Sequence, residues 1–195
     1  MPLQNRVTPL GELIATPERG LVFGNRGRLH DDEGLIRRRF AGRRWIACRL
    51  EFRGRHHGAM PPGRYTGLFF LDEATAFAAG HRPCAECRHE DYVRIVEICG
   101  ARAGAIDSRL HEERLGPYPE RPLDDVPDGA FVLREDEPWL VLDDKLLHWT
   151  PGGYTKRIPR PGGRATVITP PLLLDVLLSG WSGAVPFLHP SSLRG

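Results

Sequence analysis

Residues 64–92 read RYTGLFFLDEATAFAAGHRPCAECRHEDY, and the expected organisation of the chain follows from this stretch. The apolar run at 65–71, which turn residues bound, predicts a buried strand. Asp72 can cap a short alanine-rich helix over 73–79, because its side chain can accept a hydrogen bond from a free backbone N–H. Gly80 suits the left-handed turn that commonly ends a helix. The stretch therefore predicts a strand, a capped helix and a tight exit.

A Cys-x-x-Cys motif, Cys84 to Cys87, follows this exit directly. Pro83 stiffens the backbone in front of the motif, and Arg82 and Arg88 flank it. Two thiols at this spacing can bind one metal ion or form one disulfide. The motif by itself is therefore compatible with a zinc site and with thiol redox chemistry.

The run LFFLDEATAFAAGHRPCAECR at 68–88 resembles the second half of the Ada-type metal-binding domain. In that family a Phe-Phe strand and a helix of the form Ala-x-x-Ala-Gly lead into Phe-Arg-Pro-Cys-x-x-Cys. The positions that match are Phe69, Phe70, Ala74, Ala78, Ala79, Gly80, Arg82, Pro83, Cys84 and Cys87. The resemblance covers only residues 64–88, and it implies a metal-binding scaffold made of a strand, a helix and a knuckle.

The first half of an Ada-type domain carries an upstream Cys-x-x-x-Cys. These thiols complete four thiolates on zinc, and one of them accepts a methyl group from a DNA phosphotriester. Counting back from the Phe-Phe pair without a gap places Arg53 and His57 at the two positions. Because the acceptor thiol is missing there, methyl transfer is not expected. The resemblance then implies zinc held by Cys84, Cys87 and one of His56 and His57.

Two further cysteines lie outside the motif. Cys48 belongs to the strand-like run at 45–52 and is most simply a small core residue, although a role as a further metal ligand stays open. Cys99 falls on the apolar stripe of a helix predicted over 88–103 and is assigned to the core. The chain shows no secretory signal pattern and no apolar run long enough to cross a membrane. We therefore expect a cytoplasmic protein with reduced thiols and no membrane partner.

Charge is strongly segregated along the chain, although the net charge is only +2. Residues 26–64 hold eleven arginines and four acidic residues, and residues 107–144 hold twelve acidic residues and four arginines. Planar guanidinium groups bind phosphate bidentately, so the basic segment is suited to contact nucleic acid. Pairing between the basic and acidic segments inside the protein fits the same pattern. Both interpretations stay open.

Residues 149–154, WTPGGY, combine aromatic side chains with the cations that follow them. Such a mixture can stack on a single nucleic-acid strand and neutralise it. A tight hairpin whose aromatic side chains belong to the core fits the same residues, and we prefer this interpretation. The residues predicted to contact nucleic acid are Arg53, Arg55, Arg64, Arg82, Lys156 and Arg157.

The predicted fold class is α+β. The Ada-like segment and a following helix form a first part at 1–115, and a proline-rich acidic linker occupies 116–129. Residues 130–195 contain short strand-like runs separated by Gly, Pro and Asp, which predicts an antiparallel β-rich part. The run LLLDVLL predicts a terminal helix. The two parts can equally form one continuous domain.

Nucleic-acid binding, to DNA or to RNA, is the leading hypothesis for function. A metal-dependent hydrolase or nuclease is the first alternative, with Glu86, His89 or Asp91 as proton carriers. A thiol redox protein that uses Cys84 and Cys87 is the second, but no βαβ pattern surrounds the motif. No catalytic motif in the sequence decides whether the chain is an enzyme.

Overall fold

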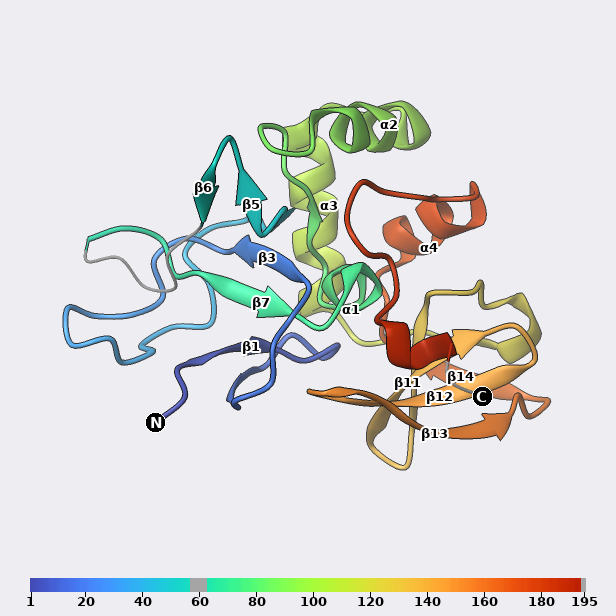
Figure 1. The fold of residues 1–195 in the computed structure, drawn as a ribbon. Coiled ribbons are helices and arrows are strands. Elements are labelled where there is room, and N and C mark those ends of the chain that lie inside the picture. Colours follow the sequence, from blue (N-terminus) through green and yellow to red (C-terminus); the bar gives the residue numbers. More distant parts are fainter. Residues whose placement is uncertain (57–62, 194–195) are drawn as a thin grey trace.

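The computed structural model describes residues 1–56 and 63–193, and for Arg55 and His56 it describes the backbone alone. The chain combines helices with two six-stranded sheets, which confirms the predicted α+β class. The first sheet lies at the left of Figure 1 and the second at the lower right, with α1 between them. None of the helices in the described ranges has the length and apolar character needed to span a bilayer.

The first sheet is mixed, with the strand order β2-β1-β7-β3-β4-β8. Two of its pairings are parallel, β1 with β7 and β4 with β8, and the others are antiparallel. Its strands are β1 (Gln4–Val7), β2 (Leu13–Ala15), β3 (Val22–Asn25), β4 (Ile46–Cys48), β7 (Leu68–Phe70) and β8 (Arg82–Pro83). A separate two-stranded hairpin, β5 (Glu51–Phe52) and β6 (Arg55–His56), follows β4.

The second sheet is antiparallel throughout, with the order β13-β12-β11-β10-β14-β9. Its strands are β9 (Glu120–Pro122), β10 (Phe131–Arg134), β11 (Glu137–Leu142), β12 (Lys145–Thr150), β13 (Gly153–Pro159) and β14 (Arg164–Val167). Trp149 and Tyr154 face each other across the β12–β13 hairpin and are both buried, as the preferred interpretation of this segment required.

The helices are α1 (Glu73–Ala78), α2 (His89–Cys99), α3 (Ala103–Leu115) and α4 (Pro171–Leu178), with 3-10 turns at Leu123–Asp125 and Pro190–Leu193. Helix α4 is the predicted terminal helix. Asp72 caps α1 as expected, because its Oδ1 accepts a hydrogen bond from the Thr75 backbone N–H at 2.9 Å. Gly80 follows α1 with a φ of 74°, in the left-handed region that the sequence predicted for it.

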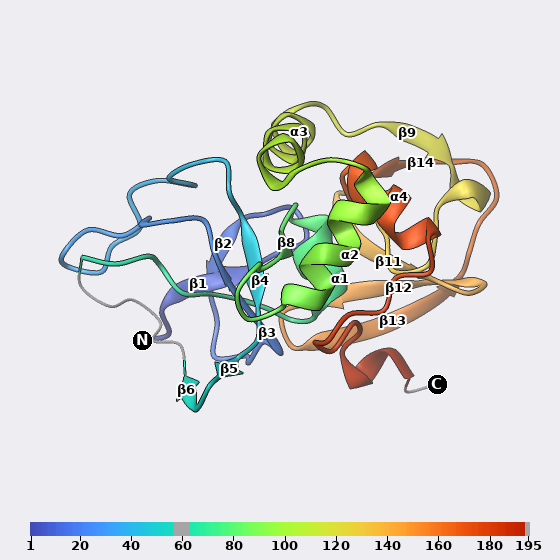
Figure 2. The same cartoon turned by 90° about the horizontal axis from the view of Figure 1, so that it is seen from above.

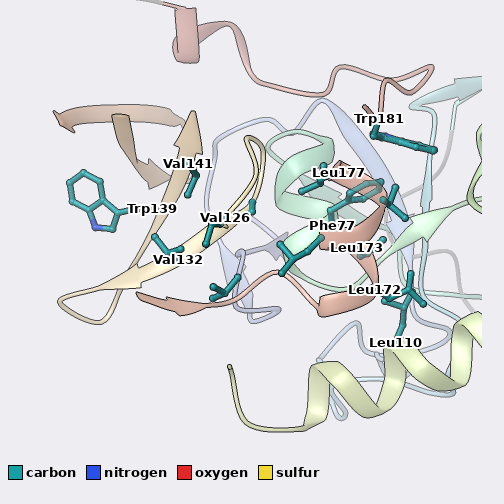
Figure 3. Close-up of a cluster of buried hydrophobic side chains, with 14 of the residues drawn as sticks. Phe77, Leu110, Val126, Val132, Trp139, Val141, Leu172, Leu173, Leu177 and Trp181 are labelled. Atoms are coloured by element: carbon teal, nitrogen blue, oxygen red, sulfur yellow. The ribbon is translucent and has the colours of Figure 1, made fainter. Parts of the chain in front are cut away.

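The largest hydrophobic core joins α1, α2 and α3 to the second sheet and to α4. Phe77 of α1 and Leu110 of α3 pack in it with Val132 of β10, Val141 of β11 and Leu173 of α4 (Figure 3). A second cluster also joins α1 to the second sheet, through Ala74, Leu140 and Leu147 among others. The acidic segment at 116–129 therefore connects two parts that share their hydrophobic cores. In Figures 1 and 2, α1 lies between the first sheet and strands β11–β13.

Candidate metal centre

The parallel pairing of β4 with β8 brings two distant cysteines together. Ala47 pairs with Pro83 in this register, and the Cys84 backbone N–H donates to the Ala47 carbonyl at 2.9 Å. Cys48 is the last residue of β4, and Cys84 is the first residue after β8. The two thiols consequently lie side by side at the edge of the first sheet.

The turn between β8 and α2 adds Cys87 to this pair. The Glu86 backbone N–H donates to Cys84 Sγ at 3.4 Å, and the Arg88 N–H donates to the Cys84 carbonyl at 3.1 Å. The Arg49 backbone N–H donates in turn to the Cys87 thiol, so that the turn is fastened to the end of β4. We call Cys48, Cys84 and Cys87 the three-cysteine cluster. Its sulfur atoms all lie within 4.8 Å of one another.

The electrostatics of the cluster favour a thiolate. The pKa of Cys84 is lowered to about 2, because the thiols of Cys48 and Cys87 and backbone N–H groups donate hydrogen bonds to its sulfur. The pKa of Cys48 is raised by its hydrogen bonds to Cys84 and Cys87 and by burial. For Cys87 the bond with Cys48 lowers the pKa, but the bond with Cys84 and burial outweigh it. The thiolate form is thus favoured at Cys84, with Cys48 and Cys87 as thiol donors, and a bound cation would favour deprotonation of all three.

Apolar, mostly aromatic side chains surround the cluster. Cys48, Cys84 and Cys87 expose only 4%, 8% and 6% of their surface, and the buried Phe23 packs against them. Four half-buried side chains also pack there: Ile46, Phe52, Tyr65 and Phe69. Such an apolar shell excludes water and strengthens the attraction between thiolates and a metal ion.

The geometry suits a tetrahedral thiolate site. A Zn–S bond of about 2.3 Å places the sulfurs of a tetrahedral site roughly 3.8 Å apart. The observed spread, within 4.8 Å, requires only small side-chain movements to reach that separation. The three-cysteine cluster can therefore hold one metal ion.

The structure places the predicted metal ligands as follows. Cys84 and Cys87 converge, and Cys48 joins them. The Ada-like register without a gap places an upstream thiol at the position of Arg53, which lies five residues after Cys48. His56 belongs by its backbone to β6, opposite Glu51 of β5, and its side chain is not described. His57 lies outside the described residues.

The sequence signal for Cys48 was its position at the end of an apolar strand upstream of the knuckle. A zinc site with a Cys-x-x-Cys knuckle needs further ligands from another segment, and Cys48 is the only cysteine upstream of the motif. The gap-free register obscured this signal. Arg53 instead forms a tight turn with Gly54, both at positive φ, between β5 and β6.

The residues predicted to contact nucleic acid do not form one surface. Arg53 and Arg64 are exposed near the first sheet, and the side chain of Arg55 is not described. Lys156 is exposed on β13, which Figures 1 and 2 show apart from β5 and β6. Arg157, also on β13, donates to the carbonyls of Ser191 and Ser192.

Arg82 lies in the interior, which corrects its prediction as a surface contact. Its Nε and Nη2 donate to the two carboxylate oxygens of Asp107 at 2.8 and 2.9 Å, and only 3% of the Arg82 surface is exposed. Because Asp107 lies in α3 and Arg82 in β8, this bidentate ion pair connects α3 to the strand that precedes the Cys-x-x-Cys motif.

A groove of about 230 Å³ opens beside Cys87, and the three predicted proton carriers line it. Glu86 and His89 are exposed there. Asp91 is engaged, because its Oδ2 accepts from Arg88 at 2.7 Å and from the Ala184 backbone N–H at 2.9 Å. Glu86 and His89 therefore remain available for proton transfer.

Comparison of the chain with family models, with curated proteins and with solved structures found no match.

Proposed function

We propose that this chain is a zinc-stabilised nucleic-acid-binding protein. The observation that carries the proposal is the buried three-cysteine cluster, which joins β4 to the knuckle. Soft thiolates in tetrahedral geometry favour zinc over oxygen-preferring cations such as magnesium. Because no metal site preforms in an unfolded chain, the bound ion contributes its binding energy to the fold.

We assign the fourth ligand to His56 or His57. The β5–β6 hairpin begins three residues after Cys48, and its backbone returns so that His56 pairs with Glu51. Three thiolates and one imidazole form a common structural zinc site.

The nucleic-acid part of the proposal rests on arginines around the cluster. Arg49 directly follows Cys48, Arg53 forms the tip of the β5–β6 hairpin, and both are exposed. Internal neutralisation was the competing explanation for the basic segment. Among the ion pairs of the described residues, none joins an arginine of 26–64 to an acidic residue of 107–144. Within the segment, Arg28 pairs with Asp32 and Arg37 with Asp31, so its remaining positive charge is left for a ligand.

Two measurements test the proposal separately. Mass spectrometry of untagged protein should find about one zinc per chain, lost in Cys48→Ser and in the double variant His56→Ala/His57→Ala. Fluorescence anisotropy should detect binding of short DNA or RNA strands that weakens steeply with salt, because phosphate contacts release counterions.

A pair of charge-matched variants sharpens the second measurement. Arg49→Gln/Arg53→Gln should reduce the slope of log K against log salt by about 2, roughly 1 for each phosphate contact. Arg134→Gln/Lys145→Gln removes the same charge from the second sheet, where both side chains are exposed, and should leave the slope nearly unchanged. Zinc without any salt-dependent binding would refute the nucleic-acid part and leave the metal site standing.

The groove beside Cys87 supports a second candidate function, a metal-dependent hydrolase. In that case the fourth position on the metal holds water, and Glu86 or His89 moves its proton. Hydrolysis of a phosphodiester by the zinc-loaded protein, reduced at least tenfold by His89→Ala, would favour this candidate. A thiol redox protein would instead form a Cys84–Cys87 disulfide on oxidation, which intact mass detects as the loss of two hydrogens.

A further inference from the structure

Arg26 is a buried cation without an acidic partner. Only 1% of its surface is exposed, and its Nε donates to His81 Nε2 at 3.1 Å. Its Nη1 donates to the Gly11 carbonyl at 2.9 Å, whereas its Nη2 has no hydrogen-bond partner in the described part of the chain. No carboxylate among the described residues forms an ion pair with it. Buried charges are normally paired, so this arrangement requires an explanation.

A second, half-buried guanidinium, that of Arg114, lies close to the first. Arg26 stacks on the Trp45 ring at 4.1 Å from the centroid, and Arg114 stacks on the same ring at 3.9 Å. Arg114 donates to the Gly80 carbonyl at 2.8 Å, but its buried Nε also lacks a partner within the residues described. Burial and the charges of Arg114 and Arg39 lower the pKa of Arg26 to about 9. The indole partly stabilises both cations, yet it supplies no negative charge.

An open groove of about 400 Å³ begins at Arg26 and runs along the arginine-rich segment. Three further cations line it, Arg37, Arg38 and Arg39, and all three are exposed. Gly11 also lines the groove, and a Cβ at this residue would lie 3.7 Å from Arg26 Nη2. Arg26 Nη2 is itself covered, and the absence of a side chain at Gly11 keeps the groove side of this nitrogen free of further side-chain atoms.

A small cavity of about 20 Å³ adjoins the groove. Gly11 and Arg39 line both spaces, and Trp45 and Arg114 line the cavity. Arg26 and Arg114, which each have one buried nitrogen without a hydrogen-bond partner among the described residues, thus border neighbouring spaces that share Gly11 and Arg39 as lining residues.

We propose that this groove binds the phosphate group of a small organic phosphate, with Arg26 at its inner end and Arg39 at its mouth. Guanidinium groups bind phosphate through paired, charge-assisted hydrogen bonds. Leu13 and Ile36 line the groove and provide apolar contact for the organic part, and the volume suits a ligand of nucleotide size. Glu12 is the single acid among the lining residues, and Arg37 is paired with Asp31, so Arg26, Arg38 and Arg39 supply the excess positive charge.

This site is independent of the zinc and nucleic-acid proposals, because neither the three-cysteine cluster nor Arg49 and Arg53 line it. Its failure would leave both of them intact, and the converse also holds.

Inorganic phosphate is the probe for the test. Thermal unfolding of the zinc-containing full chain is compared in millimolar phosphate and in chloride of equal ionic strength. At a phosphate concentration about ten times the Kd, we expect the Tm to rise by roughly 3–6 °C above its value in chloride. Titration calorimetry with phosphate and with a nucleoside monophosphate then gives the two Kd values, and the organic phosphate should bind more tightly.

Three variants locate the site. Arg39→Gln, at an exposed position, should weaken phosphate binding about tenfold, the loss expected for one charge-assisted contact. Arg26→Met keeps the shape of the side chain and should abolish the phosphate-dependent rise in Tm. Arg134→Gln on the second sheet is the charge-matched control and should respond like the unchanged protein.

Three results would each overturn the proposal. They are a Tm that rises no more in phosphate than in chloride, an Arg39→Gln variant that binds phosphate as tightly as the unchanged chain, and a control variant that loses as much affinity as Arg39→Gln. If Arg26→Met does not fold, Arg39→Gln and Arg134→Gln still decide the question.

Discussion

The Cys84 backbone N–H lies 2.9 Å from the Ala47 carbonyl oxygen, and this hydrogen bond fixes the geometry of the metal centre. It extends the parallel β4–β8 pairing by one residue, so that Cys48 and Cys84 leave adjacent strands at the same level. The tight turn from Cys84 to Cys87 then brings the third thiol to this pair. The sheet therefore positions the ligands before any metal binds, which reduces the entropy lost on binding.

Removal of the metal should destabilise the chain without unfolding it. The two largest hydrophobic cores contain none of Cys48, Cys84 and Cys87, so we expect them to persist without a bound metal ion. We expect a chelator to lower the Tm by roughly 10 °C, which corresponds to a few kcal/mol for a protein of this size. Differential scanning calorimetry with and without chelator checks this.

The matched control for chelation is Cys99→Ser. Cys99 is only half-buried and lies at the end of α2, outside the three-cysteine cluster. Its variant should show the same chelator-induced drop as the unchanged protein, whereas Cys48→Ser should start at a low Tm and show no further drop. Equal chelator sensitivity of Cys48→Ser and the unchanged chain would contradict the assignment of Cys48 as a ligand.

Breaking the ion pair between Arg88 and Glu73 should cost far more stability than breaking an exposed one. Both side chains are fully buried, and Arg88 directly follows Cys87. Burial raises the pKa of Glu73, and Arg88 opposes this shift. Glu73→Gln leaves the Arg88 charge with less compensation in the interior, so we expect a loss of about 3 kcal/mol in the free energy of unfolding.

Urea denaturation measures this loss, with Asp32→Asn as the comparison. Asp32 pairs with Arg28 at the surface, where 86% of its side chain is exposed, and its substitution should cost less than about 1 kcal/mol. Similar losses in the two variants would show that the interior pair contributes no more than the surface pair.

The sequence predicted local structure well and long-range partnerships poorly. The cap at Asp72 and the left-handed Gly80 follow from interactions within a few residues, and both are confirmed. For Cys48 the sequence favours a core position and leaves a ligand role open, because its partners lie 36 and 39 positions away and only strand pairing brings them together.

The same limit applies to the charged residues. The sequence predicts Arg82 as a contact to nucleic acid beside the Cys-x-x-Cys motif, whereas its partner Asp107 belongs to α3, 25 positions away. Arg26 belongs to a turn-like tetrad, GNRG, which gave no sign that the guanidinium is buried on Trp45. Burial of an arginine depends on distant elements, so composition alone does not reveal it.

Acid should destabilise the chain through His81. Burial, and then the charges of Arg26 and Arg114, lower the pKa of this histidine well below its usual value. In the unfolded chain His81 takes up a proton near pH 6.5, but in the folded chain it does so only at much lower pH. Between these values the unfolded state binds more protons, so stability is full above pH 6.5 and falls as the pH drops below it.

The measurement is the free energy of unfolding between pH 5 and 7.5 for the unchanged chain and His81→Gln. The Gln amide oxygen can still accept the hydrogen bond from Arg26 Nε, but it does not titrate. The unchanged chain should lose up to about 1.4 kcal/mol more per pH unit below 6.5 than the variant. His89→Gln, at an exposed position, should retain the acid sensitivity, and parallel pH profiles for the unchanged chain and His81→Gln would rule out this role.

Loss of the Tyr154 hydroxyl should weaken the contact between the first helix and the second sheet. Tyr154 OH on β13 donates to Asp72 Oδ2 at 2.7 Å, and the His189 backbone N–H donates to the same oxygen at 2.9 Å. Asp72 is fully buried, which raises its pKa although these donors oppose the shift. Tyr154→Phe removes one donor from a buried carboxylate, so we expect a cost of about 1–3 kcal/mol.

Tyr92→Phe serves as its control, because it removes a half-buried hydroxyl but keeps the ring that faces Arg82. Its cost should stay within about 0.5 kcal/mol. Urea denaturation should be followed by tryptophan fluorescence, since Trp149 donates to Thr75 in the same buried network. If this network fastens the second sheet to α1, Tyr154→Phe should shift one cooperative transition to lower urea. A separate early transition of the second sheet would instead mean that the shared hydrophobic cores alone hold the two parts together.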